Sequence, residues 1–341
     1  MWRTARVPPE PFLHLGVTDR PAFRSEDNLE PEASVGRAVL FPGQGTQVPR
    51  MGEPWRAHPA WEIVERAEAA VGEPLADLLL EAGEDRLART REAQLAVMLV
   101  SLMAWEAIRG SVGDPVAVAG HSLGQVTSLV AAGALSLEDG VRLAARRAEL
   151  TQTAADRTGG RMAALVGASL EQAEEACRPA DGAEQSCWVA NDNAPRQVVV
   201  GGTPEGLDAA GERARELGVR RVLPLNVGGA FHTPLMADAR AGLEPVLAET
   251  AFAAPAWPVV SNVDARPYED GDGWRARLAD HLVRPVRWRE TMESLVDLGA
   301  ESFLEVGPGA VLEGLARRTV PGREVRGVAV PDDVPPLMEV A

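Results

Sequence analysis

A serine flanked by glycines, in Gly-His-Ser-Leu-Gly at residues 120–124, constrains the fold of this chain more than any other feature. Residues 115–119 before it are apolar and typical of a buried strand, and residues 125–132 after it are apolar at helical spacing. A G-x-S-x-G turn between a strand and a helix is a nucleophile elbow, whose glycines permit a turn that a β-carbon would block. The alternative is a chance occurrence in a Gly- and Ala-rich chain, but the flanking strand and helix favour the elbow.

The predicted elbow makes Ser122 a candidate nucleophile. The turn would lift its hydroxyl above the edge of a sheet, at the N-terminus of the following helix. There the helix dipole and the free backbone N–H groups favour a developing oxyanion.

The composition excludes several functional classes. The chain has 341 residues and a formal net charge of -16, which argues against nucleic acid as a bulk partner. No apolar run approaches the roughly 20 residues of a membrane span, and the first residues lack the apolar core of a signal peptide. Cys177 and Cys187 are too few for a disulfide framework or a metal cage, so we expect a cytoplasmic protein without a metal. We also expect a monomer that binds neither nucleic acid nor a membrane.

The predicted elements divide the chain into two parts, with extensions at both ends. Residues 1–35 are rich in Pro and Glu and predict an extended arm, and residues 331–341 predict a Pro-rich acidic tail. The larger part begins with a buried strand and a loop that contains glycines. Its first elements are the strand at 37–41, the loop at 42–47, several helices in 59–110 with the longest near 92–109, the elbow, and a helix at 137–152 with Ser136 as its N-cap.

A second pattern follows in residues 161–228. Strands and helices alternate there in the order β-α-β-β-α-β, which is the ferredoxin-like split unit. The predicted strands are 161–167, 186–190, 197–200 and 220–225, and the predicted helices are 170–178 and 204–217. We therefore predict a small domain at 161–228 inserted into a larger one at 36–160 and 229–330. The returning part includes helices to about Glu249, a strand at 258–262 and a final strand at 302–306.

The candidate nucleophile needs a base within hydrogen-bond reach, because a serine hydroxyl is a poor nucleophile at neutral pH. His14 lies in the arm, His58 follows a helix candidate, and the side chain of His121 should point away from that of the adjacent serine. His232 and His281 remain. A lone histidine is usually structural, but His232 follows a Gly-Gly turn at the predicted domain junction, which favours it as the base.

Five motifs along the chain carry a resemblance to a known family. They are Phe-Pro-Gly-Gln-Gly-Thr-Gln at 41–47, Gly-His-Ser-Leu-Gly at 120–124, Asn-Ala-Pro-Arg-Gln-Val-Val at 193–199, Gly-Ala-Phe-His-Thr at 229–233 and Glu-Val-Gly-Pro-Gly at 305–309. Together they resemble the malonyl-CoA:acyl-carrier-protein transacylase family over roughly residues 36–325. The resemblance implies an α/β fold, with an α/β-hydrolase-like large domain and an inserted ferredoxin-like small domain.

The resemblance also implies a ping-pong acyl transfer through an acyl-serine ester. Ser122 would attack the acyl thioester, and His232 would take its proton and later activate the incoming phosphopantetheine thiol. The backbone N–H groups of Gln44 and Leu123 would form the oxyanion hole. The imidazole of the base would be held by the backbone carbonyl of His281, at a position where the family commonly has glutamine.

Arg147 sets the substrate class that the resemblance implies. It matches the family's arginine that binds the free carboxylate of malonyl, and a planar guanidinium binds a carboxylate bidentately. The alternatives are a solvated helix face, or a register shifted by one residue that would give this role to Arg146. Phe231, Gln94 and Asn193 are the further substrate-binding positions that the resemblance implies.

Several positions depart from the family pattern. Gln125 replaces the usual glutamate after the elbow, and Leu95 replaces a proline. Arg146 and Arg147 stand where family members usually have one arginine followed by glycine. These departures suggest a specialised, freestanding acyltransferase of polyketide or fatty acid biosynthesis.

The resemblance further implies a coenzyme A thioester (acyl-CoA) as donor substrate, no bound cofactor, and an acyl carrier protein as partner. Carrier proteins are usually acidic, so this acidic chain needs a local arginine patch to dock one. The candidates for that patch are Arg196, Arg220, Arg221, Arg284 and Arg287.

Four functions remain open from the sequence. The first is transfer of a malonyl group from coenzyme A to a carrier protein, and the second is transfer of a larger acyl group between two carrier proteins. The third is hydrolysis of stalled acyl chains, and the fourth is a catalytically silent docking module. Arg147 favours the first, because a neutral acyl group would leave its buried charge without a partner. The presence of Ser122 and His232 argues against the fourth.

Overall fold

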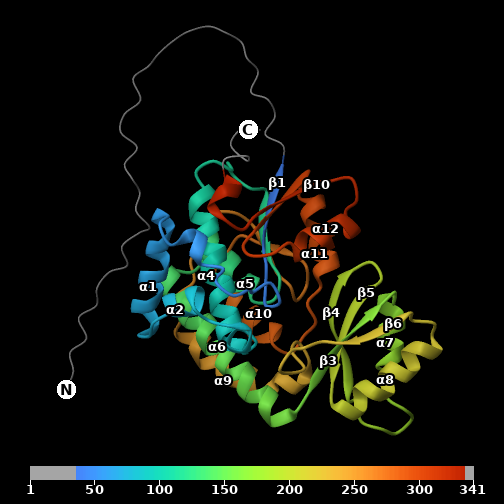
Figure 1. Cartoon of the computed structure of the whole chain (residues 1–341). Helices are drawn as coiled ribbons and strands as arrows, with labels where there is room; N and C mark the ends of the chain where they lie inside the picture. Colours follow the sequence, from blue (N-terminus) through green and yellow to red (C-terminus); the bar gives the residue numbers. More distant parts are fainter. Residues whose placement is uncertain (1–35, 335–341) are drawn as a thin grey trace, which may run out of the picture. The chain divides into compact units, whose positions relative to one another are not determined.

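A six-stranded sheet forms the centre of the larger part of the chain (Figure 1). Its strands lie in the order β10 (Glu324–Val328), β9 (Ser302–Val306), β1 (Arg37–Phe41), β2 (Ala117–Gly120), β7 (Val259–Val260) and β8 (Pro267–Tyr268). Neighbouring strands are parallel except for β8, which is antiparallel to β7. The computed structural model describes residues 36–334, so the predicted arm with His14 and residues 335–341 of the predicted tail lie outside the described residues.

Helices cover both faces of this sheet, because successive strand side chains alternate between the two faces. The helices are α1 (Glu62–Val71), α2 (Ala76–Leu80), α3 (Glu84–Leu87), α4 (Thr90–Ile108), α5 (Gly124–Ala131), α6 (Leu137–Thr158), α9 (Ala237–Glu249), α10 (Trp274–His281), α11 (Trp288–Asp297) and α12 (Val311–Thr319). Val39 and Phe41 pack into a core with α4, α5 and α6. Ala38 and Leu40 pack on the other side against α11 and α12. Within residues 36–334, no helix is long and apolar enough to cross a membrane.

A second sheet is antiparallel and has four strands. They lie in the order β4 (Cys187–Ala194), β5 (Gln197–Gly202), β3 (Arg161–Val166) and β6 (Arg221–Pro224). Helices α7 (Leu170–Ala176) and α8 (Pro204–Glu216) pack on it through small side chains such as Ala173 and Ala210. The first and third strands of a β-α-β-β-α-β unit lie at its centre, as in a ferredoxin-like fold. The predicted fold class is therefore confirmed, while the domain boundaries stay a prediction.

Both cysteines lie in the core between this sheet and its helices. Cys177 follows α7 and Cys187 begins β4, and their Sγ atoms are 3.2 Å apart. Both are free thiols and buried, and their mutual contact and burial raise the pKa of the Cys177 thiol. They act as small, unreactive core residues.

Several elements run differently from the prediction. The strand predicted at 186–190 continues as β4 to Ala194, because irregularities at Val189–Asn191 and Asp192–Ala194 let it keep pairing with β5. The helix predicted at 137–152 continues to Thr158. The strand at 302–306 is not the final one, since β10 lies parallel beside it. The sequence of β10, Glu-Val-Arg-Gly-Val, has charges and a glycine that suit an edge strand and hide the strand pattern.

The structure describes the first residues of the predicted tail. Residues Pro331–Asp333 form a short 3₁₀ helix. The carboxylate of Asp333 accepts the backbone N–H groups of Ala329 and Val330, at 2.8 and 3.0 Å, which holds this turn in place.

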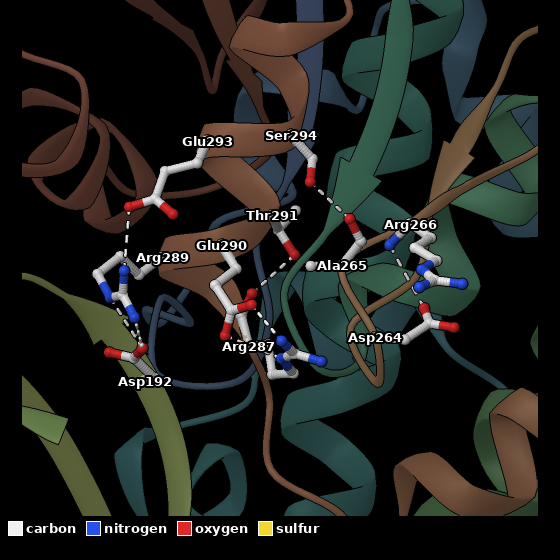
Figure 2. A network of polar contacts seen from close by, with 10 residues as sticks. All are labelled: Asp192, Asp264, Ala265, Arg266, Arg287, Arg289, Glu290, Thr291, Glu293 and Ser294. Carbon is white, nitrogen blue, oxygen red and sulfur yellow. Dashed lines mark hydrogen bonds and ion pairs between the residues drawn. The ribbon is translucent and has the colours of Figure 1, made fainter. Parts of the chain in front are cut away.

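Helix α11 and the segment before it link the two sheets through polar contacts (Figure 2). Arg289 forms an ion pair with the buried carboxylate of Asp192 on β4, with 2.9 Å between the charged atoms. Ser294 donates to the backbone carbonyl of Ala265, in the turn after β7, at 2.6 Å. The N–H of Asp192 donates to the carbonyl of Val286, just before the helix, at 2.9 Å. The helix therefore fixes β4 relative to the end of β7.

We expect Gly120→Ala to destabilise the protein, because a β-carbon there would lie 1.8 Å from the carbonyl oxygen of Gly124. Relieving such an overlap by moving backbone costs about 1–3 kcal/mol or more. Gly314→Ala is the matched control, since Gly314 lies inside α12 and a β-carbon there meets nothing within 4 Å. Alanine should stabilise that helix by about 0.5–1 kcal/mol. Chemical denaturation followed by circular dichroism measures both, and equal stability of the two variants would contradict a tight turn at Gly120.

Candidate active site

The turn between β2 and α5 holds Ser122 in the left-handed region, with a φ of 53°. This conformation is uncommon for a residue with a β-carbon and persists only where the surroundings impose it. The neighbouring glycine allows very close packing, since a β-carbon at Gly124 would lie 2.1 Å from the carbonyl oxygen of Phe41. The N–H of His121 donates to the same oxygen at 3.0 Å. The elbow therefore lies where the carboxyl ends of β1 and β2 meet.

His232 lies within hydrogen-bond distance of the serine, with its Nε2 2.8 Å from Ser122 Oγ. Its Nδ1 lies 2.7 Å from the backbone carbonyl oxygen of His281. A carbonyl only accepts, so Nδ1 carries the proton and Nε2 accepts from the serine hydroxyl. His281 is the last residue of α10, where helix carbonyls lack an intrahelical donor. Serine, imidazole and carbonyl thus form a chain that can take the proton of Ser122.

The surroundings keep the imidazole of His232 neutral. Burial lowers its pKa to about 3, and the positive charge of Arg147 acts in the same direction. The pKa of His281 lies well below its usual value, mainly because that ring is also buried. A neutral imidazole is the form that accepts a proton, so His232 has the protonation state of a general base.

Arg147, on α6, lies beside the serine. One guanidinium nitrogen donates to Gln94 Oε1 at 2.8 Å, and another lies 3.2 Å from Ser122 Oγ. The residue is 4% exposed, and burial lowers its pKa to about 10, so it stays charged at neutral pH. Within the part of the chain that the structure describes, no carboxylate pairs with it. Its neighbour Arg146 is exposed and pairs with Glu149 at 3.1 Å.

These groups line a cleft of about 210 Å³. Gln44, from the loop after β1, lines it, and its Oε1 accepts from Gln94 Nε2 at 3.4 Å. Phe231 lines it next to the base, and Met162 and Val199 of the second sheet contribute an apolar wall. The cleft thus has polar groups at the serine and apolar side chains from the second sheet around it.

The backbone N–H groups near the serine have different surroundings. The N–H of Ser122 donates to the Oδ1 of Asn262 at 2.9 Å. Leu123 directly precedes α5, and the first N–H groups of that helix donate to the backbone carbonyls of His121, Ser122 and Leu123. Gln44 lines the cleft on the side of the loop after β1. The structure therefore brings Gln44 to the cleft that holds Ser122, while Leu123 is buried directly after the serine, and the oxyanion hole stays a prediction.

His121 points away from the serine hydroxyl, as the sequence predicted. Its Nε2 lies 2.8 Å from the Oδ1 of Asn193, and its ring packs edge-on against that of Trp288 at 5.3 Å between centroids. Asn193 also lines the cleft. Because Asn193 belongs to β4, this contact links the second sheet to the elbow.

Two polar residues beside the serine were not assigned from the sequence. Asn262 ends the segment predicted as a strand at 258–262, and Gln125 differs from the glutamate usual in the family. Their contacts with each other and with Ser122 span more than 130 residues, at 137 and 140 positions apart. Asn262 follows a buried strand closely, but only the structure shows that this strand neighbours β2.

The five arginines considered for docking differ in their surroundings. Arg284 and Arg287 pair with Asp280 and Glu290. Arg196, Arg220, Arg221 and Arg284 are exposed, and Arg287 is partly buried. Among residues 36–334, no group of three or more His, Cys, Asp or Glu side chains is arranged to hold a metal ion.

Comparisons with known proteins extend over both sheets and the cleft. The family described as acyl transferase domain matches residues 39–335. The malonyl CoA-acyl carrier protein transacylase of Bacillus subtilis is 35% identical over 306 residues, which cover 89% of this chain and 95% of that protein. The polyketide biosynthesis malonyl CoA-acyl carrier protein transacylase BaeC of Bacillus velezensis is 38% identical, over 82% of this chain and 95% of that protein.

A solved structure has the same fold as this chain. It contains a type II polyketide synthase acyl-carrier protein in complex with its malonyl-transacylase, and it matches with a TM-score of 0.85 and 32% identity. The match covers 90% of this chain and 100% of that one. On the family match, these relatives and the shared fold, the chain belongs to the acyl transferase family.

Proposed function

We propose that this chain moves a malonyl group from coenzyme A to the phosphopantetheine thiol of an acyl carrier protein. The observation that carries this proposal is the buried Arg147, which lies 3.2 Å from Ser122 Oγ and pairs with no carboxylate among the described residues. A buried charge without a partner is costly. The free carboxylate of a malonyl thioester supplies that partner beside the nucleophile. The names of the relatives from Bacillus subtilis and Bacillus velezensis support this donor and this acceptor.

In the first half-reaction, Ser122 Oγ attacks the thioester carbonyl carbon while His232 Nε2 takes the hydroxyl proton. The carbon–sulfur bond then breaks, the proton passes from His232 to the leaving thiolate, and a malonyl ester remains on the serine. The backbone N–H groups of Leu123 and Gln44 stabilise the negative oxygen that forms at each step. The carbonyl of His281 keeps the imidazole oriented throughout.

In the second half-reaction, the thiol of the carrier protein replaces coenzyme A. His232 takes the thiol proton, the sulfur attacks the ester carbonyl, and the proton returns to Ser122 Oγ as the ester bond breaks. Transfer of a larger neutral acyl group, or hydrolysis of one, would leave Arg147 unpaired in the cleft.

The name of the Bacillus velezensis relative supports a role in polyketide or fatty acid biosynthesis. We also propose that the enzyme is a monomer in the cytoplasm.

Ser122→Ala should remove both the acyl-enzyme and the transfer activity without unfolding the protein, because alanine keeps the β-carbon of the turn. Intact mass after incubation with malonyl-CoA detects the acyl-enzyme, and thermal denaturation serves as the control for folding. A malonyl adduct at another residue, with transfer still intact, would refute the assignment of the nucleophile.

His232→Ala should nearly abolish turnover, whereas His281→Ala should cost little, because the hydrogen bond from position 281 to the base comes from its backbone carbonyl. Steady-state kinetics of malonyl transfer measures both variants.

The pKa of His232 is lowered to about 3, so the imidazole is neutral above that pH and protonated only below it. The pH profile of kcat/KM should therefore show no histidine inflection between about pH 5 and pH 8. An inflection near the ordinary histidine pKa that disappears in His281→Ala would instead give the side chain of His281 a role in catalysis.

Arg147→Ala should cut acylation by malonyl-CoA, because truncating one partner of a buried charge pair costs about 2–5 kcal/mol, or about 30- to 5000-fold. Acylation by acetyl-CoA should fall little or rise, since acetyl carries no distal carboxylate. The quantity to measure is the ratio of the malonyl and acetyl acylation rates. Arg146→Ala is the matched control and should leave that ratio unchanged, because its side chain lies on the surface.

Two results would change the conclusion about Arg147. A collapse of the ratio in Arg146→Ala alone would assign the carboxylate to the neighbouring arginine. An unchanged ratio in both variants would mean that the physiological acyl group has no free carboxylate, and transfer between carrier proteins would replace the proposal.

A further inference from the structure

The side chain of Asn262 contacts the backbone of the nucleophile directly. Its Oδ1 accepts the N–H of Ser122 at 2.9 Å, and the residue is 1% exposed. Asn262 follows β7 closely, and β7 pairs in parallel with β2, the strand that leads into the elbow. Because the carboxyl ends of two neighbouring parallel strands meet at one edge of the sheet, the amide of Asn262 reaches the turn.

Asn262 is itself held from two sides. Its N–H donates to Gln125 Oε1 at 2.8 Å, and its carbonyl accepts the N–H of Arg287 at 3.0 Å. Gln125 is 2% exposed, lies in the first turn of α5 and donates through Nε2 to Ser128 Oγ at 3.3 Å. Asn262 is thus fixed to the helix that follows the nucleophile and to the segment that leads into α11.

The contact matters because the conformation of Ser122 is unfavourable by itself. A residue with a β-carbon at a φ of 53° stays there only when its surroundings hold it. The glycines at 120 and 124 make room for the turn, but they do not bind the serine. The hydrogen bond to Asn262 is the side-chain contact that fixes the backbone of the serine itself.

We propose that Asn262 is a positioning residue for the nucleophile. By accepting the N–H of Ser122, it keeps the serine in its left-handed conformation, with Oγ 2.8 Å from the Nε2 of His232. The same bond occupies this N–H, so the oxyanion is left to the N–H groups of Leu123 and Gln44. Gln125 acts through Asn262 and serves to orient it. This inference rests on the acyl transfer proposed above.

Asn262→Leu tests the contact, because leucine has a similar size and no acceptor. The N–H of Ser122 would lose its partner, and kcat/KM for acylation by malonyl-CoA should fall about 5- to 150-fold, as expected for one donor left without its acceptor. The loss should appear in kcat, with KM for malonyl-CoA nearly unchanged. The ratio of malonyl to acetyl acylation should also stay unchanged, since Arg147 is not touched.

Ser261→Ala is the matched control. Ser261 is the buried neighbour of Asn262, and its Oγ accepts only a weak hydrogen bond from the N–H of Val263 at 3.3 Å. This variant perturbs the same segment without touching the serine at 122. A kcat for Asn262→Leu equal to that of Ser261→Ala, with both proteins folded, would overturn the proposal. So would a loss that lies in KM alone.

A second pair of variants decides the question even where Asn262→Leu does not fold. Gln125→Glu keeps an oxygen that accepts the N–H of Asn262, whereas Gln125→Met has a similar length and no acceptor. We expect Gln125→Glu to retain a kcat several-fold higher than Gln125→Met, and equal kcat values would contradict the proposal.

The Ser122→Ala variant distinguishes a failure of the proposed reaction from a failure of the role of Asn262. If it still forms the acyl-enzyme, Ser122 is not the nucleophile of the proposed reaction; if it does not, an unaffected Asn262→Leu overturns only the role of Asn262.

Discussion

The close backbone contact between the carboxyl ends of β1 and β2 is the constraint on which the site depends. Parallel pairing aligns Phe41 with Gly120, and the glycine at 124 lets α5 approach the carbonyl of Phe41 closer than any β-carbon would permit. The loop after β1 and the turn after β2 therefore line one cleft. The remaining groups are added to this frame, with Arg147 from α6 and His232 from the segment that returns from the second sheet.

Features with strong local signals could be predicted from the sequence. Each of these features is built from short segments whose apolar pattern predicts a single kind of element. They are the buried strand at 37–41, the strand before the elbow and the β-α-β-β-α-β order. The strand β10 and the end of β4 could not be predicted in this way. An edge strand tolerates the charges and glycine of 324–328, and β4 needs two irregularities in its pairing that only its partner β5 reveals.

The same distinction applies to the candidate site. The elbow and the histidine after the Gly-Gly turn are marked by their own neighbours. Only the structure, which buries Arg147 and exposes Arg146, separates these two arginines. Asn262 has no such mark, because its importance comes from the side-by-side placement of β7 and β2. The carbonyl of His281 was expected only through the family resemblance, since a backbone group leaves no trace in the residue type.

The guanidinium of Arg147, which pairs with no carboxylate among the described residues, makes the electrostatic potential inside the cleft differ from that around the protein. The whole chain has a net charge of -16, so at a distance it repels the anionic phosphates of a coenzyme A thioester. Ionic screening at physiological salt confines such repulsion to about 8 Å. Inside the cleft the sign is reversed, because a neutral imidazole and a charged arginine leave one positive charge in a low-dielectric site. Capture of an anionic acyl group is thus a short-range event, governed by the last few ångströms of approach.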